Sequence, residues 1–168
     1  MRADKFTIKS REAIADAQDL ADERQHAEVR PIHLLSALLD QREGIVVPII
    51  EKLGVGIDRV RNSAQQEVDR LGRVEGGRLS ISNDLSDVLK VAQNEADALR
   101  DEYVSTEHLL LALVQSSDKT GELLREHGVN EDSVREAMEE VRGSQRVTDQ
   151  DAEGKYQALE EYTRDLTG

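Results

Sequence analysis

Residues 31–41 read P-I-H-L-L-S-A-L-L-D-Q, and residues 106–116 read T-E-H-L-L-L-A-L-V-Q-S. Aligned without gaps at an offset of 75, the two stretches share five residues, beginning with His33 against His108. The correspondence extends on both sides, through the pairs Thr7 and Ser82, Ala17 and Ala92, Ala21 and Ala96, Val29 and Val104 and, at an offset of 74, Gly54-Val55 and Gly128-Val129. One structural unit has therefore been duplicated, and this repeat decides the architecture before any single residue does.

Apolar residues recur at helical spacing in both units, and no stretch shows the alternation of a strand. Thr7 and Ser82 each stand where a hydroxyl can cap a first long helix by accepting a bond from a free backbone amide. The pattern predicts an all-α body of eight helices, arranged as two pseudo-twofold repeats of four-helix units. We expect repeat 1 over about residues 7–71 and repeat 2 over about residues 82–142.

The segments outside the two repeats predict the domain boundaries. Residues 72–81 contain three glycines and no helical period, so they join the repeats. Residues 143–155 are polar and aperiodic, which predicts a flexible linker after a domain that spans residues 1–142. Residues 156–168 resume a helical spacing, so a further region is expected to start there.

Composition excludes several functional classes. The formal net charge of −13 repels phosphate backbones, so nucleic acid is not an expected partner. The absence of cysteine excludes disulfides and cysteine-ligated zinc. No apolar run approaches the roughly 20 residues of a membrane span, and the first residues lack the apolar centre of a secretory signal. We therefore expect a cytoplasmic protein that does not bind membranes.

Two alternative roles can be considered for both histidines of the repeated motif. His33 and His108 each lie near the third position of a predicted helix, where an imidazole can accept a bond from a free backbone amide of the first turn. A metal site is the alternative, but neither histidine is followed by a second ligand four residues later. The chain also lacks a nucleophile elbow and a phosphate-binding loop. We predict structural caps, no metal or cofactor in this chain and no catalytic residue.

A small set of residues near the predicted groove between the first helices of the two repeats suggests a binding surface. Val91 lies off the centre of the apolar stripe of its helix, and Tyr103 lies in a turn, so both are expected to be partly exposed. Asp101 and Glu107 flank the same turn and, taken by themselves, are expected to be solvent-exposed acids.

The tandem of His-Leu-Leu-x-Ala-Leu units, each followed by a Leu-Gly-Val or His-Gly-Val cap, resembles the double Clp N-terminal domain of AAA+ protein disaggregases. The opening M-R-A-D-K-F-T, the stretch D-E-Y-V-S-T-E-H-L-L-L-A-L at residues 101–113 and the sequence V-R-G-S at residues 141–144 are similar as well. So is the exit Y-Q-A-L-E-E-Y-T-R-D-L-T at residues 156–167, which in that family leads into the first ATPase domain. The resemblance covers the whole chain.

The resemblance implies a function that composition alone does not. Such disaggregases are homohexameric ATP- and magnesium-dependent machines that extract polypeptides from aggregates together with the Hsp70-type chaperone system. Their N-terminal domain binds unfolded or aggregated protein through a surface groove and holds no nucleotide, so this chain is expected to be monomeric and not an enzyme by itself. The alternative is the N-domain of a protease-linked Clp ATPase, which shares the fold and docks dedicated adaptor proteins.

The resemblance also implies the residues of the groove. The polar positions beside it in the family correspond here to Thr7, Asp101 and Glu107. Leu89 and Val91 are the candidates for its apolar lining. His108 departs from relatives that carry an apolar residue at that position.

Overall fold

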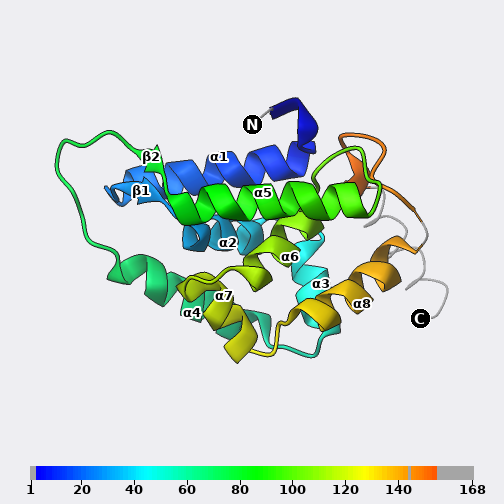
Figure 1. Ribbon diagram of the computed structural model, residues 1–168. Coiled ribbons are helices and arrows are strands. Elements are labelled where there is room, and N and C mark those ends of the chain that lie inside the picture. The colour runs from blue at the N-terminus through cyan, green and yellow to red at the C-terminus, as the bar shows by residue number, and fades with distance from the viewer. Residues whose placement is uncertain (1–2, 144, 155–168) are drawn as a thin grey trace.

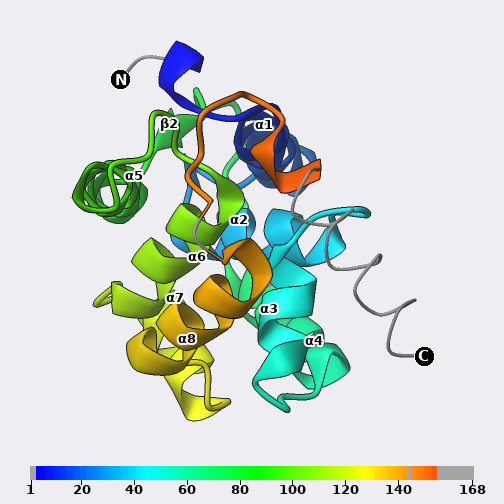
Figure 2. The same ribbon diagram turned by 90° about the vertical axis from the view of Figure 1, so that its right-hand side faces the viewer.

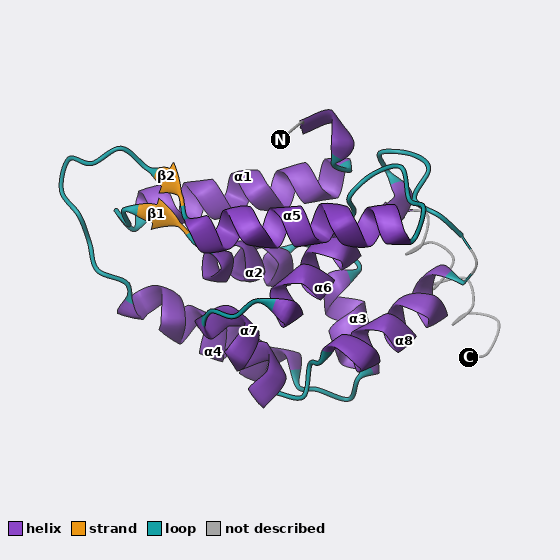
Figure 3. Cartoon of the chain, viewed as in Figure 1, coloured by secondary structure: helices purple, strands orange, loops and turns teal. Residues whose placement is uncertain are grey.

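The computed structural model describes residues 3–143 and 145–154, and most of this part of the chain is helical (Figure 3). A short 3-10 helix, η1 (Ala3–Lys5), precedes the first repeat. The helices of the first repeat are α1 (Ile8–Glu23), α2 (Pro31–Asp40), α3 (Val46–Lys52) and α4 (Ile57–Arg70). The helices of the second repeat are α5 (Asn83–Ala98), α6 (Thr106–Gln115), α7 (Lys119–Glu126) and α8 (Glu131–Arg142). The prediction of an all-α body built from two four-helix units is confirmed.

The two copies of the repeated motif, α2 and α6, form the centre of the molecule. Their leucines are almost all inaccessible, including Leu34, Leu35, Leu109 and Leu110. Helix α1 packs on α2 and α5 packs on α6, so the two long helices lie above the centre in Figure 1. The other face follows the same symmetry, since α3 contacts α8 and α4 contacts α7. The core is therefore shared between the repeats, because the apolar face of each helix must be buried against another element.

Two short strands that the sequence analysis did not predict connect the repeats crosswise. Strand β1 (Glu28–Val29) pairs in parallel with β2 (Ser80–Ile81), the segment that leads into α5. The segment that leads into α1 pairs in the same way with the other repeat, through a parallel bridge between Phe6 and Val104. Two residues are too few for an alternating pattern, so the sequence carries no signal for them.

The chain after α8 turns back onto the body. Gly143 has a φ of +62°, a left-handed conformation that glycine adopts without steric cost, and the chain reverses there. The C-terminal strap, residues 145–154, then runs across the ends of α1 and α5, as the orange segment in Figure 2 shows. Val147 and Ala152 of the strap are 0% and 3% exposed.

The flexible linker over residues 143–155 stays a prediction, but the packing of the strap on the body was not predicted. Val147 and Ala152 are isolated apolar residues that do not follow a helical period, so the sequence carries no indication that they are buried. Both nevertheless belong to the core cluster. The predicted region over residues 156–168 lies outside the described residues. Over residues 3–143 and 145–154, no helix has the length and apolar character needed to cross a membrane.

Candidate functional site

The histidines of the repeated motif cap the two central helices. His33 Nδ1 accepts a hydrogen bond of 2.9 Å from the Arg30 amide, and His108 Nδ1 accepts one of 2.8 Å from the Ser105 amide. These bonds confirm the predicted caps. Because Nδ1 is the acceptor in both rings, the proton of each neutral imidazole is on Nε2.

The Nε2 atoms donate to different partners at equivalent positions. His33 Nε2 lies 2.8 Å from His26 Nδ1, whereas His108 Nε2 lies 2.7 Å from Asp101 Oδ2. In repeat 1, burial and then the nearby charge of His26 lower the pKa of His33 to about 4, so this pair is neutral. In repeat 2 an acid stands in place of the second histidine, and the cap becomes part of a charged network.

Asp101 is the centre of that network. Its Oδ1 accepts bonds of 2.7 Å from Arg142 Nη2 and 2.8 Å from the amide of Val147. Burial alone would raise the pKa of Asp101, but the bonds from His108, Arg142 and the Val147 amide outweigh it and lower the pKa to about 2. The prediction of a solvent-exposed acid is wrong, since the side chain of Asp101 is 0% exposed.

Glu107 is buried as well, in the first turn of α6. The Ser105 hydroxyl donates to its Oε1, while its Oε2 accepts no hydrogen bond and lies 3.8 Å from Arg142 Nε. Burial, followed by the charge of Glu153, raises the pKa of Glu107 to about 8. The acid that was expected at the surface is therefore buried, and its raised pKa favours the protonated, uncharged form at neutral pH.

The neighbour that raises this pKa comes from the strap. Glu153 is 0% exposed, and its Oε2 accepts bonds of 2.7 Å from Thr7 Oγ1 and 2.9 Å from the Thr106 amide. Burial raises the pKa of Glu153 above its usual value. Its other oxygen, Oε1, has no hydrogen-bond partner. Two carboxylates from distant parts of the chain thus meet at the start of α6.

Thr7 has the capping role that its sequence position predicts. Its Oγ1 accepts a bond of 3.2 Å from the Ser10 amide at the start of α1 and also donates to Glu153. The strap therefore links the three predicted polar residues, because its Val147 amide bonds to Asp101 and its Glu153 bonds to Thr7 beside Glu107. All three are covered by the strap or by the body, where open groove positions were expected.

The two apolar candidates on α5 differ in exposure. Leu89 is 6% exposed and packs into the core, so it offers little surface to a ligand. Val91 is half-buried and packs against the core cluster from outside. Ile8, at the start of α1, and Ile81, before α5, are more exposed, at 41% and 46%.

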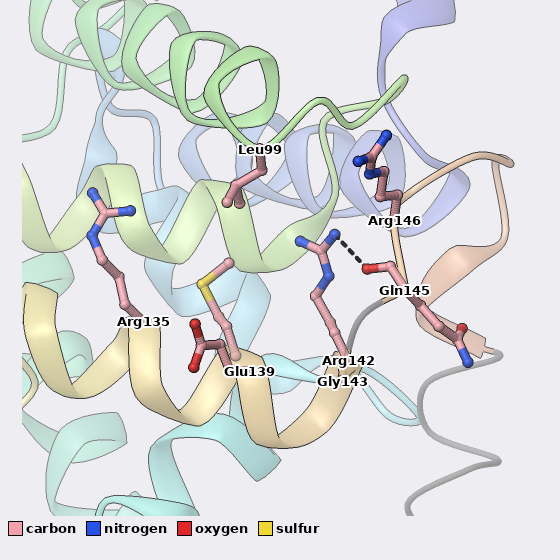
Figure 4. A pocket seen from close by; sticks show the side chains of 8 residues that line it. Leu99, Arg135, Glu139, Arg142, Gly143, Gln145 and Arg146 are labelled. Atoms are coloured by element: carbon pink, nitrogen blue, oxygen red, sulfur yellow. Dashed lines mark hydrogen bonds between the residues drawn. The ribbon is translucent and has the colours of Figure 1, made fainter.

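A pocket of about 280 Å³ lies beside the start of the strap, between the end of α5 and helix α8 (Figure 4). Leu99 and Met138 give it an apolar wall, and Arg135, Arg142 and Arg146 line its rim. The dashed line in Figure 4 is the bond of 3.0 Å from Arg142 Nη2 to the carbonyl of Gln145, which holds the first residue of the strap. No cluster of histidines and carboxylates suited to a metal ion occurs in the part of the chain that the structure describes.

Sequence reasoning missed Arg142, Val147 and Glu153. Each lies more than 30 residues from its partner, and each is an ordinary residue of a polar segment. The sequence signal that could have indicated these contacts is Gly143, because a glycine directly after a helix often marks a point where the chain turns back.

Comparison with known proteins agrees with the fold and with the repeat. The model of the Clp repeat (R) N-terminal domain family matches residues 5–127. The chaperone protein ClpB of Rhodopirellula baltica is 40% identical over 167 residues, which cover 99% of this chain and 19% of that protein. The chain thus spans about one fifth of the length of this relative.

Two solved structures share the fold. The N-terminal domain of Hsp104 from Candida albicans superposes with a TM-score of 0.80 at 21% identity, covering 89% of this chain and 99% of that one. A ClpV N-domain in complex with a VipB peptide superposes with a TM-score of 0.66 at 22% identity, covering 81% and 86%. With a matching family model over most of its length and the two-repeat helical fold, the chain belongs to the Clp repeat (R) N-terminal domain family.

Proposed function

We propose that this chain is the client-binding N-terminal domain of a ClpB-type ATP-dependent protein disaggregase, and that unfolded or aggregated polypeptide binds where the strap lies. The main observation behind this proposal is that the surface holds the strap, a segment without regular strand structure, through main-chain hydrogen bonds. The Glu102 amide donates to the Val147 carbonyl at 2.7 Å, and the Ile8 amide donates to the Gln150 carbonyl at 2.8 Å. Main-chain bonds do not depend on side chains, which suits clients of many sequences.

The residues implied by the resemblance have distinct tasks in this proposal. Thr7 and Asp101 offer polar groups to the backbone and side chains of a client, and Glu107 sets the charge of the site. Val91 and the exposed Ile8 supply apolar contact, while Leu89 supports the wall from within. The aliphatic contacts contribute about 1 kcal/mol per methyl-sized group, and association entropy offsets much of this, so affinity should be modest.

A relative in sequence and a relative in structure both support the proposal. The chain is 40% identical to the matching part of a ClpB chaperone, and a ClpV N-domain of the same fold occurs in complex with a peptide. On this proposal the whole protein is a cytoplasmic AAA+ homohexamer that uses ATP and magnesium in its other domains and works with an Hsp70-type system. This domain contributes binding, not catalysis, and is monomeric by itself.

Docking of a dedicated adaptor is the second candidate function. The complex of a ClpV N-domain with a VipB peptide favours it, because the ligand there is one defined peptide. The two candidates differ in selectivity, since a client site accepts unrelated unfolded chains and an adaptor site accepts one partner.

Titration of residues 1–168 with two unrelated, permanently unfolded proteins tests the proposal. Amide chemical shifts should change in residues 5–8, 101–107 and 145–153 with both ligands. The folded form of one of these proteins is the matched control and should cause no change. Shifts confined to the α3 and α4 face, or binding of only one of the two ligands, would contradict client binding at this surface.

A further inference from the structure

The strap is placed like a bound ligand. Its Val147 enters the core cluster, its Glu153 enters the start of α6, and its exposed residues between them, such as Asp151, face solvent. Contacts of the strap with the body include backbone bonds at Glu102 and Ile8. A segment held by two buried anchors and main-chain bonds has the pattern of a bound peptide.

The pocket around Glu153 is suited to a carboxyl group. The first backbone amides of a helix are free donors and favour negative charge, and the Thr106 amide is one of them. The Thr7 hydroxyl donates from the opposite side, at the N-cap of α1. The overall charge of −13 would repel an acidic ligand, so attraction here is local to these two donors.

The equivalent place in repeat 1 lacks the amide donor and the acid of this pocket. Pro31 replaces Thr106 and has no amide hydrogen to donate. Ile32 takes the position of Glu107, whereas Ser82 takes the position of Thr7 and keeps a hydroxyl. A carboxyl group would therefore find both an amide and a hydroxyl donor in repeat 2 only, and the fold alone does not create the pocket.

We propose that Thr7, Thr106 and Glu107 form a binding pocket for an acidic side chain of a client segment, and that Glu153 of the strap is its tethered internal ligand. This inference rests on the proposed function. It specifies the preferred client as a segment with an apolar residue followed six residues later by a glutamate, the spacing of Val147 and Glu153. A client must displace the strap to bind.

The charges facing the pocket are consistent with an acidic ligand. Glu107 faces Glu153 from α6, with Arg142 of α8 and Asp101 beyond it. Because the pKa of Glu107 is raised to about 8, this group holds a proton at neutral pH and does not repel a second carboxylate at full strength. Neither Glu107 Oε2 nor Glu153 Oε1 makes a hydrogen bond, so each oxygen is available to carry that proton.

The test uses a peptide of residues 145–153 and a chain whose own strap lacks the glutamate. Thr106→Pro removes the amide donor while keeping the helix, because proline is favoured at this position and Pro31 occupies it in repeat 1. Glu153→Ala removes the internal ligand and keeps the donors. Asp151→Ala is the matched control, since it removes the same charge from an exposed position of the strap.

The peptide should bind the Glu153→Ala chain at least about tenfold more tightly than it binds the unchanged chain, in which the strap competes. A peptide with Glu153→Ala should bind at least about tenfold less tightly, and a peptide with Asp151→Ala should bind like the original. Adding Thr106→Pro to the Glu153→Ala chain should remove the preference for the glutamate peptide. Amide spectra report on folding of each variant.

The proposed pocket is contradicted if the glutamate and alanine peptides bind with equal affinity. It is also contradicted if neither peptide binds the Glu153→Ala chain. Unfolded proteins should also bind the Glu153→Ala chain several-fold more tightly than the Asp151→Ala chain. If the peptide results hold and no unfolded protein binds either chain, the pocket stands and the proposed client function fails. The two failures are therefore distinguishable.

Discussion

The two repeats use one backbone frame for two different kinds of chemistry. In both, a histidine at the third position of the central helix caps its own first turn. In repeat 1 that histidine donates to His26, in a neutral pair, whereas in repeat 2 it donates to Asp101, which also binds Arg142. Duplication kept the cap and changed the position seven residues before it, which places a charged network beside the strap and leaves repeat 1 without one.

The largest difference between the repeats should appear when these equivalent positions are truncated. Asp101→Ala removes the carboxylate that is hydrogen-bonded to the buried Arg142 and leaves the Val147 amide without this acceptor, so we expect a loss of about 3–5 kcal/mol of unfolding free energy. His26→Ala removes one neutral bond and should cost about 1 kcal/mol. Urea unfolding of both variants measures the difference, and equal losses would contradict the distinct roles.

Acid should destabilise repeat 1 through His33. The pKa of this group is lowered to about 4 in the folded protein, so its contribution to stability is present above pH 6.5 and is lost as pH falls toward 4. This shift corresponds to at most about 3 kcal/mol. His33→Gln keeps a capping side chain without titrating in this range, so its stability should depend less on pH between 6.5 and 4. Parallel slopes for the two proteins in that range would refute the assignment.

Alkali should loosen repeat 2 at the strap. The pKa values of Glu107 and Glu153 are raised in the docked arrangement, so docking is fully stable below their usual values and weakens as pH rises through about 8. Between pH 6 and 9 we expect a loss of about 1–2 kcal/mol of docking free energy.

Glu153→Gln keeps an acceptor oxygen for Thr7 and Thr106 but carries no charge, so it should remove most of this dependence. Methyl resonances of Val147 and Ala152 report docking directly. An unchanged pH profile in the Gln variant would show that the carboxylate pair is not responsible.

The smallest expected effects come from the two caps that begin the long helices. Thr7→Ala and Ser82→Ala each remove an acceptor for a first-turn amide and should each cost about 1 kcal/mol. Only Thr7 also donates to Glu153, so only its variant should shift the resonances of the strap. A strap that responds equally to both variants would mean that the cap, not the bond to Glu153, controls it.

Features encoded locally could be predicted from the sequence. The caps at Thr7 and Ser82 and the capping histidines follow from residues three positions apart, and the repeat doubles each signal. The helices follow from apolar periodicity, because an amphipathic helix needs only its own sequence and a core to cover. Because the fold class follows from these local signals, it could be predicted correctly from the sequence.

The burial of the acids could not be predicted, because it depends on partners far away in the chain. Asp101 and Glu107 are buried by Arg142, Val147 and Glu153, none of which shares a periodic pattern with them. A carboxylate has no intrinsic preference for the interior, so only a known partner turns a surface acid into a core group. The resemblance pointed to these positions without indicating that the strap covers them.

The crossed pairings of Phe6 with Val104 and of β1 with β2 make the domain equivalent to a dimer whose two subunits have exchanged their leading segments and are joined by residues 72–79. Neither repeat completes its own turn, so one repeat alone should not fold without a second copy. A chain cut between Gly76 and Gly77, in the exposed connection, should by contrast remain associated, because each fragment supplies a segment that the other lacks.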